Sequence, residues 1–423
     1  MAVKFAFVHA LRYLCNMRRL FTILMLLAPL TVFGQKVAIS GIVADERTGE
    51  PLPQATVSTA AGGRSTSVVT NEEGFFTLKT DDATPALSIS HLGYQTRRVE
   101  IPASPPPALR ILLRPTSIAL HEIMVWTEDA RRLVDIAIGK IADNYSRRPE
   151  LYNCFYRETA MKRQHYIYVA EGIVDMYKTA YDRPNTLHDR AAIVKGRRLV
   201  SPRQSDTLGV KVIGGPVLPI QLDLAKNPDL LLNESDLAHY AFRMEVPTSI
   251  DGRLQYVVSI EPNAVLPYAL YHGRLYIDRE TLAFTRAELS LDMDDREKAT
   301  RFMLVRKPAG VRFRPKELST LIDYRTENGV TRISYVRSTI RFNCDWRRRL
   351  FATSFTACCE MVVTSHTDRD IRPISGRDSF DRRDAFYDRV DYFLDPSFWA
   401  DYNIIEPTET LDRAIDKLIK KHR

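Results

Sequence analysis

The Asn328-Gly329 dipeptide lies between two strand-like stretches and constrains the fold of this chain more than any other feature. A two-residue type I′ turn needs positive φ at both central positions, which asparagine and glycine tolerate best. The stretch 318–324 places Leu318 and Ile322 on one face, and the stretch 330–342 is rich in β-branched and aromatic residues. The dipeptide therefore predicts a β-hairpin with long arms.

A second stretch, 286–294, alternates strictly, so that Ala287, Leu289, Leu291 and Met293 share one side of a strand. With the neighbouring runs it predicts an antiparallel meander of about six strands across 268–367. Each large aliphatic side chain left exposed on its apolar face would forfeit about 1.5–3 kcal/mol, so this face must be covered.

Apolar stripes at helical spacing predict two amphipathic helices, over 133–145 and 411–419. We expect both helices to pack on the apolar face of the meander and to form an ordinary core with it. The alternative is that only the first helix packs there, which would leave a trough for an acyl chain or for an apolar segment of a partner.

The first 35 residues predict export. Met17-Arg18-Arg19 forms a basic start, the run 20–30 is apolar, and 32–34 resembles a small-residue cleavage site, so we expect cleavage after Gly34. A retained N-terminal anchor is the alternative. Half of the net charge of +8 lies in this segment, and the remainder of the chain shows no electrostatic footprint for nucleic acid. The periplasm or the outer membrane is the expected location.

Residues 36–114 read as a small all-β sandwich, because short apolar runs alternate with glycine and proline punctuation. Its motifs are Gly41-x-Val43-x-Asp45-x-x-Thr48-Gly49-x-Pro51-Leu52-x-x-Ala55-x-Val57, Thr70-Asn71-x-x-Gly74-x-Phe76 and Gly93-Tyr94. In these motifs the segment resembles the carboxypeptidase-regulatory-like, prealbumin-like domain of exported proteins of Gram-negative bacteria. The resemblance implies a folding and interaction module without catalytic residues.

The remaining chain divides into a linker at 115–127 and an α+β domain at 128–423, with the curved antiparallel sheet centred on 240–367 and a final helix at 408–421. The tail 395–411 resembles the ending of an uncharacterised family of exported bacterial proteins that carry a regulatory-like domain. The meander, with Gly273-x-Leu275-Tyr276-Ile277-Asp278 as its best match, is similar to the half-barrel of periplasmic lipoprotein carriers.

Motifs for familiar chemistry are missing from the sequence. No histidine is followed by glutamate three residues later, and there is neither a Gly-x-Ser-x-Gly elbow nor a P-loop. We therefore expect no catalytic residue, cofactor or metal site. The acidic cluster 292–295 is a strand end or, less readily, a calcium site. The run 346–349 is a charged turn or a grip for a lipid phosphate or an anionic glycan.

Other side chains that could carry a function have simpler explanations. Tyr166, Tyr168 and Tyr177 could stack on sugars but fit a half-buried strand, and no role is assigned to His165, His239 and His272. The cysteines Cys154, Cys344, Cys358 and Cys359 are too few for a disulfide scaffold. We expect buried thiols, with a Cys154–Cys344 or Cys344–Cys358 bridge as the alternative.

These observations favour a non-enzymatic binding or assembly protein of the cell envelope. Its partner would be an apolar ligand, a glycan or an outer-membrane protein, with no nucleic acid and no transmembrane helix after the signal. The alternative is an enzyme of unrecognised type, a hydrolase, in which the carboxylates Glu158, Glu171 and Asp175 face a cleft.

Overall fold

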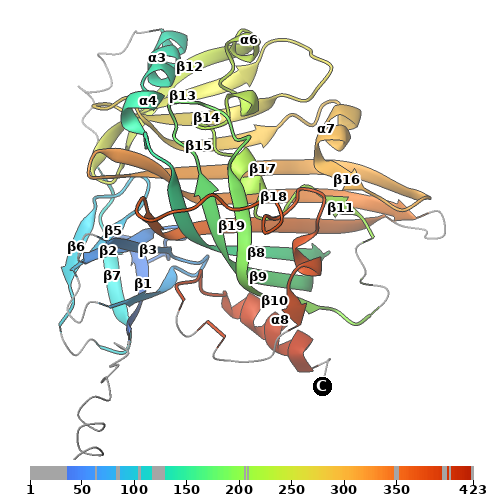
Figure 1. The fold of residues 1–423 in the computed structure, drawn as a ribbon, viewed down its shortest axis with the longest axis horizontal. Coiled ribbons are helices and arrows are strands. Elements are labelled where there is room, and N and C mark those ends of the chain that lie inside the picture. Colours follow the sequence, from blue (N-terminus) through green and yellow to red (C-terminus); the bar gives the residue numbers. More distant parts are fainter. Residues whose placement is uncertain are drawn as a thin grey trace, which may run out of the picture. The chain divides into compact units, whose positions relative to one another are not determined.

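The computed structural model describes residues 36–61, 64–81, 86–102, 106–116, 129–203, 206, 209–346, 352–392, 398–399 and 402–420. The predicted export signal, most of the predicted linker and the arginines 347–349 lie outside these residues. From Val37 onward the chain forms one compact unit (Figure 1).

The first part of this unit is a β-sandwich of two small sheets, ordered β4-β1-β7 and β3-β2-β5-β6. Its strands are β1 (Val37–Asp45), β2 (Thr56–Ala61), β3 (Arg64–Val69), β4 (Phe75–Thr80), β5 (Ala86–Ser90), β6 (Arg97–Glu100) and β7 (Leu109–Leu113). Asp45 shapes the first turn, because its Oδ1 accepts hydrogen bonds from the backbone N–H of Arg47 at 2.6 Å and of Thr48 at 2.9 Å. The sandwich has a core of its own, which includes Val57 and Phe76. The predicted fold class is confirmed.

The second part is built on one 11-stranded sheet, in the order β12-β13-β14-β15-β17-β18-β19-β8-β9-β10-β20. Its strands are β8 (Glu150–Lys162), β9 (His165–Lys178), β10 (Arg190–Val200), β12 (Tyr240–Ile250), β13 (Arg253–Pro262), β14 (Tyr271–Asp278), β15 (Phe284–Leu291), β17 (Val311–Glu327), β18 (Val330–Trp346), β19 (Thr353–Thr367) and β20 (Asp391–Tyr392). All neighbours are antiparallel except β10 and β20. Asn328 and Gly329 have φ values of 51° and 78°, as a type I′ turn requires.

The sheet is larger than the meander that the sequence predicts. The hairpin β8–β9 does not stand apart, because β8 pairs with β19 along its whole length. β10 forms within 182–208, a polar and basic segment, and extends the sheet beyond β9. The pairing of β8 with β19 joins strands from the two halves of the chain, and local sequence patterns cannot predict such a pairing.

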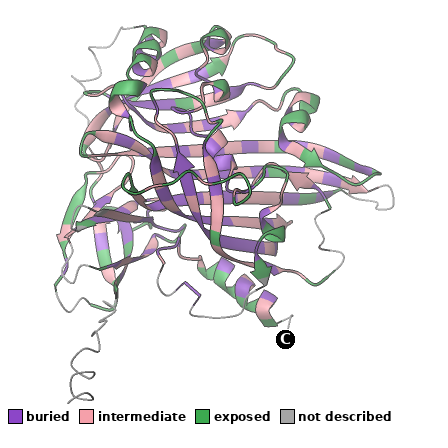
Figure 2. Ribbon diagram, in the orientation of Figure 1, coloured by how far each residue is buried: buried purple, intermediate pink, exposed green. Residues whose placement is uncertain are grey.

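One face of this sheet carries the main core, and Figure 2 shows its strands banded by buried residues. Ala287, Leu289 and Leu291 are buried there with residues from α3 (Ala130–Gly139), α4 (Ile141–Asn144) and α7 (Arg296–Met303). The segment 213–239, with the short helices α5 (Leu218–Gln221), η2 (Pro228–Leu230) and α6 (Glu234–Leu237), contributes eight further apolar residues to this core: Leu218, Ile220, Leu222, Leu224, Ala225, Leu231, Leu232 and Leu237.

The prediction that the C-terminal helix packs on this same face is wrong. α8 (Glu409–Lys420) buries Leu411, Ile415 and Leu418 against Val169 of β9 and Leu199 of β10. Val169 points away from the side of β9 that carries Ala170, which belongs to the main core. The segment 213–239 takes the place that the sequence assigns to α8.

The sandwich packs on the sheet through β3 and β19. Val69 joins Phe155 and Val362 in a buried cluster. Ser67 Oγ donates to the carbonyl oxygen of Val363 at 2.9 Å, and Arg337 forms an ion pair with Glu72. The region around Phe155 is therefore covered on both faces of the sheet.

Candidate functional site

An apolar cavity of about 240 Å³ lies on the main-core side of the sheet, against β8, β9, β18 and β19. β11 (Lys211–Val212), which pairs with β16 (Leu304–Arg306), and η3 (Phe386–Asp388) cover it. Ten apolar side chains line it: Ala160, Ile167, Val200, Val210, Val212, Ile213, Ile340, Ala357, Ala385 and Phe386. Its volume is slightly below the range of about 300–1,000 Å³ that is usual for ligand pockets.

Glu158 is the main charged group in the wall of this cavity. Tyr156 Oη donates to its Oε1 at 2.6 Å, Tyr168 Oη donates to its Oε2, and the backbone N–H of Gly215 donates to Oε1 at 2.5 Å. Burial, reinforced by the charge of Glu158, raises the pKa of both tyrosines well above their ordinary value, so both phenols stay protonated and donate. Three donors thus hold one carboxylate in a fixed position.

The Gly214-Gly215 turn brings a backbone N–H to this carboxylate. Gly215 has φ +81°, and a Cβ on it would lie 2.5 Å from the Phe380 ring. A Cβ on Gly214 would lie 3.0 Å from Glu158 Oε1. Only glycine allows the chain to pass so closely in this conformation.

Cationic side chains stand at the edge of the cavity. Lys211 Nζ donates to the carbonyl oxygen of Arg383, and the exposed Arg306 lies nearby on the lining. Burial lowers the pKa of Lys211, and the positive charge of Arg306 lowers it further. The negative charges of Asp384 and Glu158 raise this pKa but do not offset the decrease. The site therefore combines apolar walls with the fixed carboxylate of Glu158 and with charged groups of both signs, namely Asp206, Asp384, Lys211 and Arg306.

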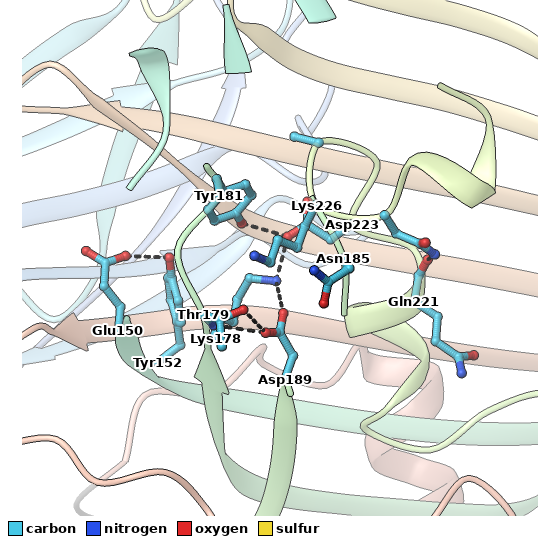
Figure 3. A network of polar contacts seen from close by, with 12 residues as sticks. Glu150, Tyr152, Lys178, Thr179, Tyr181, Asn185, Asp189, Gln221, Asp223 and Lys226 are labelled. Atoms are coloured by element: carbon cyan, nitrogen blue, oxygen red, sulfur yellow. Dashed lines mark hydrogen bonds and ion pairs between the residues drawn. The ribbon is translucent and has the colours of Figure 1, made fainter. Parts of the chain in front are cut away.

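A buried polar network holds the segment 213–239, which continues from the Gly214-Gly215 turn, against the sheet (Figure 3). Lys178 Nζ lies 2.6 Å from Asp223 Oδ2 and 3.4 Å from Asp189 Oδ2. Asp223 also accepts hydrogen bonds from Tyr181 Oη at 2.6 Å and from Tyr324 Oη at 2.9 Å. Burial alone would lower the pKa of Lys178, but Asp223 and Asp189 together raise it, so the lysine stays charged.

The three carboxylates of the predicted hydrolase do not converge. Glu158 faces the cavity, whereas Glu171 points to the other side of β9 and pairs with Arg157 and Arg197, both at 2.8 Å. Asp175 accepts a hydrogen bond from Asn153 Nδ2 at 3.0 Å on that same side. Glu158, Glu171 and Asp175 therefore do not face one common cleft.

Other residues named in the sequence analysis take part in capping, hydrogen bonding or packing within the fold. Asp295 caps α7 by accepting from the backbone N–H of Glu297 and Lys298. Tyr168 holds Glu158, Tyr166 packs beside α8 and Tyr177 is buried. Among the described residues four thiols are free, and three of them are buried: Cys154, Cys344 and Cys359.

His165, His239 and His272 lie in separate parts of the structure, and none of them is near Trp346 in the sequence. His165 lies in an open cleft beside α8, and His272 lies in a polar groove on the other face of the sheet. Trp346 ends β18. Within the described part of the chain, no group of three or more His, Cys, Asp or Glu side chains is placed to hold a metal ion. No helix there is long and apolar enough to span a bilayer.

Sequence reasoning missed most of the cavity. Lys211, Val212 and Phe386 come from segments without a periodic apolar pattern. Among the lining residues, the Gly214-Gly215 pair is the one local sequence signal, because two glycines in a row indicate a turn. The rest depends on strands that pair across long sequence distances.

Comparisons with known proteins identify one domain. Residues 39–125 match the family model of the CarboxypepD_reg-like domain, which confirms the resemblance indicated by the motifs. A comparison with curated proteins gives no match.

Two solved structures similar to this chain are distant from it. A DUF1329 family protein from Desulfovibrio piger has 12% identity and a TM-score of 0.23, over 58% of this chain and 96% of that chain. A LolA superfamily protein from Nitrosomonas europaea has 14% identity and a TM-score of 0.18, over 56% of this chain and 94% of that chain. Likenesses at this level carry no information about ligand or activity.

Proposed function

We propose that the chain is an exported, non-enzymatic binding protein of the cell envelope whose cavity beside Glu158 holds a small apolar ligand or apolar group. The observation that carries this proposal is the cavity itself, since ten apolar side chains surround space that the described residues leave open. The features of residues 1–35 support export, and the sandwich at 36–114 is proposed as a separately folding interaction module.

The surroundings of Glu158 support binding over hydrolysis. Its two oxygens already accept three hydrogen bonds, and neither Glu171 nor Asp175 shares its side of the sheet. Acid–base hydrolysis by two carboxylates needs both on the same bond. A fixed carboxylate beside an apolar wall is better placed to orient a ligand or to hold the Gly214-Gly215 turn.

The test uses the uncharged fluorophore N-phenyl-1-naphthylamine, whose emission rises in apolar surroundings. The mature protein is expected to bind it saturably. Ala357→Phe, which fills the cavity from a half-buried position, should weaken binding about tenfold or more, because little apolar space remains. Thr356→Phe is the matched control, since Thr356 precedes Ala357 on β19 and does not line the cavity.

Both variants are first compared with the wild type by thermal melting, so that only folded protein is assayed. Equal binding by the wild type and Ala357→Phe would contradict the proposal, as would the absence of saturable binding. Turnover of an ester substrate that depends on Glu158, tested with Glu158→Gln, would favour the hydrolase instead.

A further inference from the structure

An open cleft of about 470 Å³ lies beside the cavity, between the β8–β9 turn, the chain after β10, and α8. Its lining is strongly basic. It contains six residues with basic side chains, Lys162, Arg163, His165, Arg203, Arg413 and Lys417, and a single acidic one, Asp206. Such an excess of one sign in a concave site attracts the opposite charge.

α8 turns its basic side toward this cleft. Thr410, Arg413, Ala414 and Lys417 follow one another at helical spacing and all line the cleft. The exposed Asp412 and Asp416 on the same helix do not line it. The sequence of α8 thus separates its charges into two rows, and the positive row faces the concave surface.

Little negative charge compensates this row. Arg413 pairs with Glu409, and Lys162 Nζ lies 3.0 Å from Asp206 Oδ1. Among the described residues, no carboxylate lies within ion-pair distance of Arg163, Arg203 or Lys417. These cations are exposed, so an anion could approach them without first breaking a buried contact.

The cleft and the apolar cavity share a border. Ile167 and Asp206 line both. Asp206 is held in place there, because Ser201 Oγ donates to its Oδ2 at 2.7 Å and Lys162 pairs with Oδ1. An apolar compartment and a positively charged compartment therefore meet at the same end of β8 and β9.

We infer that the ligand is an anionic amphiphile with a single acyl chain, whose chain enters the cavity and whose head group lies among Arg163, Arg203 and Lys417. This inference rests on the proposed function, because the cavity must first accept an apolar chain. The cleft adds the second half of the recognition, a preference for a phosphate or carboxylate head group.

The experiment compares three probes that compete with N-phenyl-1-naphthylamine: dodecyl phosphate, 1-dodecanol and inorganic phosphate, with the first two below their aggregation limits. Dodecyl phosphate should bind about tenfold or more tightly than 1-dodecanol, and added salt should reduce only the former affinity. The variant Arg203→Gln/Lys417→Gln should weaken dodecyl phosphate roughly threefold to tenfold, as expected for two exposed charge contacts. It should leave 1-dodecanol unchanged.

The matched control is Arg132→Gln/Lys140→Gln, which removes two positive charges from the α3 region, near β12 at the other edge of the sheet. It should change neither affinity. Equal affinities for the two dodecyl probes would overturn the inference while leaving the proposed function in place. If inorganic phosphate competed as well as dodecyl phosphate, the dodecyl chain would contribute nothing to binding, and the inference that the cavity and the cleft form one site would be wrong. If neither dodecyl probe binds, both proposals fail.

Discussion

Replacing Leu291 by asparagine tests whether the apolar face of β15 is a closed core. Leu291 is 2% exposed, pairs with Tyr271 across β14, and belongs to the same buried cluster as Ala299 and Met303 of α7. Losing the burial of a leucine costs about 1.5–3 kcal/mol, and a buried amide without a partner adds about 1–3 kcal/mol. The variant should therefore lose about 2.5–6 kcal/mol, a large share of a total stability of about 5–15 kcal/mol.

The assay is thermal unfolding followed by circular dichroism, where this loss corresponds to a fall in Tm of roughly 3–7 °C for a chain of this size. Ser290→Asn is the control, since Ser290 is only partly buried and points to the polar groove on the opposite face. It should change Tm by no more than about 2 °C, as is usual for substitutions outside the core. If Leu291→Asn melted like the wild type but lost N-phenyl-1-naphthylamine binding, the face would be an open trough and the packing described above would be wrong.

Two further predictions concern buried charge. Burial, aided by the positive charge of Arg286, lowers the pKa of His91, so the folded protein resists a proton that the unfolded chain takes up near pH 6.5. Stability from this source is present above that pH and falls as the pH drops, by at most about 1.4 kcal/mol per unit, and urea unfolding at pH 7.5 and 5.5 should show a smaller loss for His91→Gln than for the wild type. Lys178→Met leaves Asp189 and Asp223 without their shared cation and should cost about 3–5 kcal/mol, whereas the exposed Lys420→Met should cost almost nothing in the same urea titration; equal midpoints for the two would refute the role given to the network.

The sequence predicts those parts of the fold that depend on neighbours in the chain. Asn328-Gly329 sets the turn between β17 and β18, and the alternation of β15 correctly assigns Ala287, Leu289 and Leu291 to one buried face. The sandwich follows from its turn residues, such as Asp45. Each of these signals lies within a few residues of the structure that it specifies.

The cavity and the position of α8 could not be predicted in this way. The apolar stripe of α8 shows that one side of the helix is buried, but it does not say which face of the sheet receives it. The cavity lining combines residues from 158 to 387, and its cover comes from short strands without a periodic pattern. Only the tertiary pairing of β8 with β19 places these segments together.

β8 and β9 are buried on both faces, which explains why their packing is hard to predict from the sequence and where the cavity and the cleft lie. Phe155 and Ile173 face the sandwich side, while Tyr156 and Ala170 face the main core, so the hairpin reads as a nearly continuous apolar run without alternation. Such a run does not reveal that its two faces have different covers. At the end of the hairpin, near Ile167, α8 covers one face, and β11, η3 and the described residues 213–215 cover the other. The apolar space and the basic cleft therefore meet at this end of the hairpin, where Ile167 and Asp206 line both and the two faces have different covers.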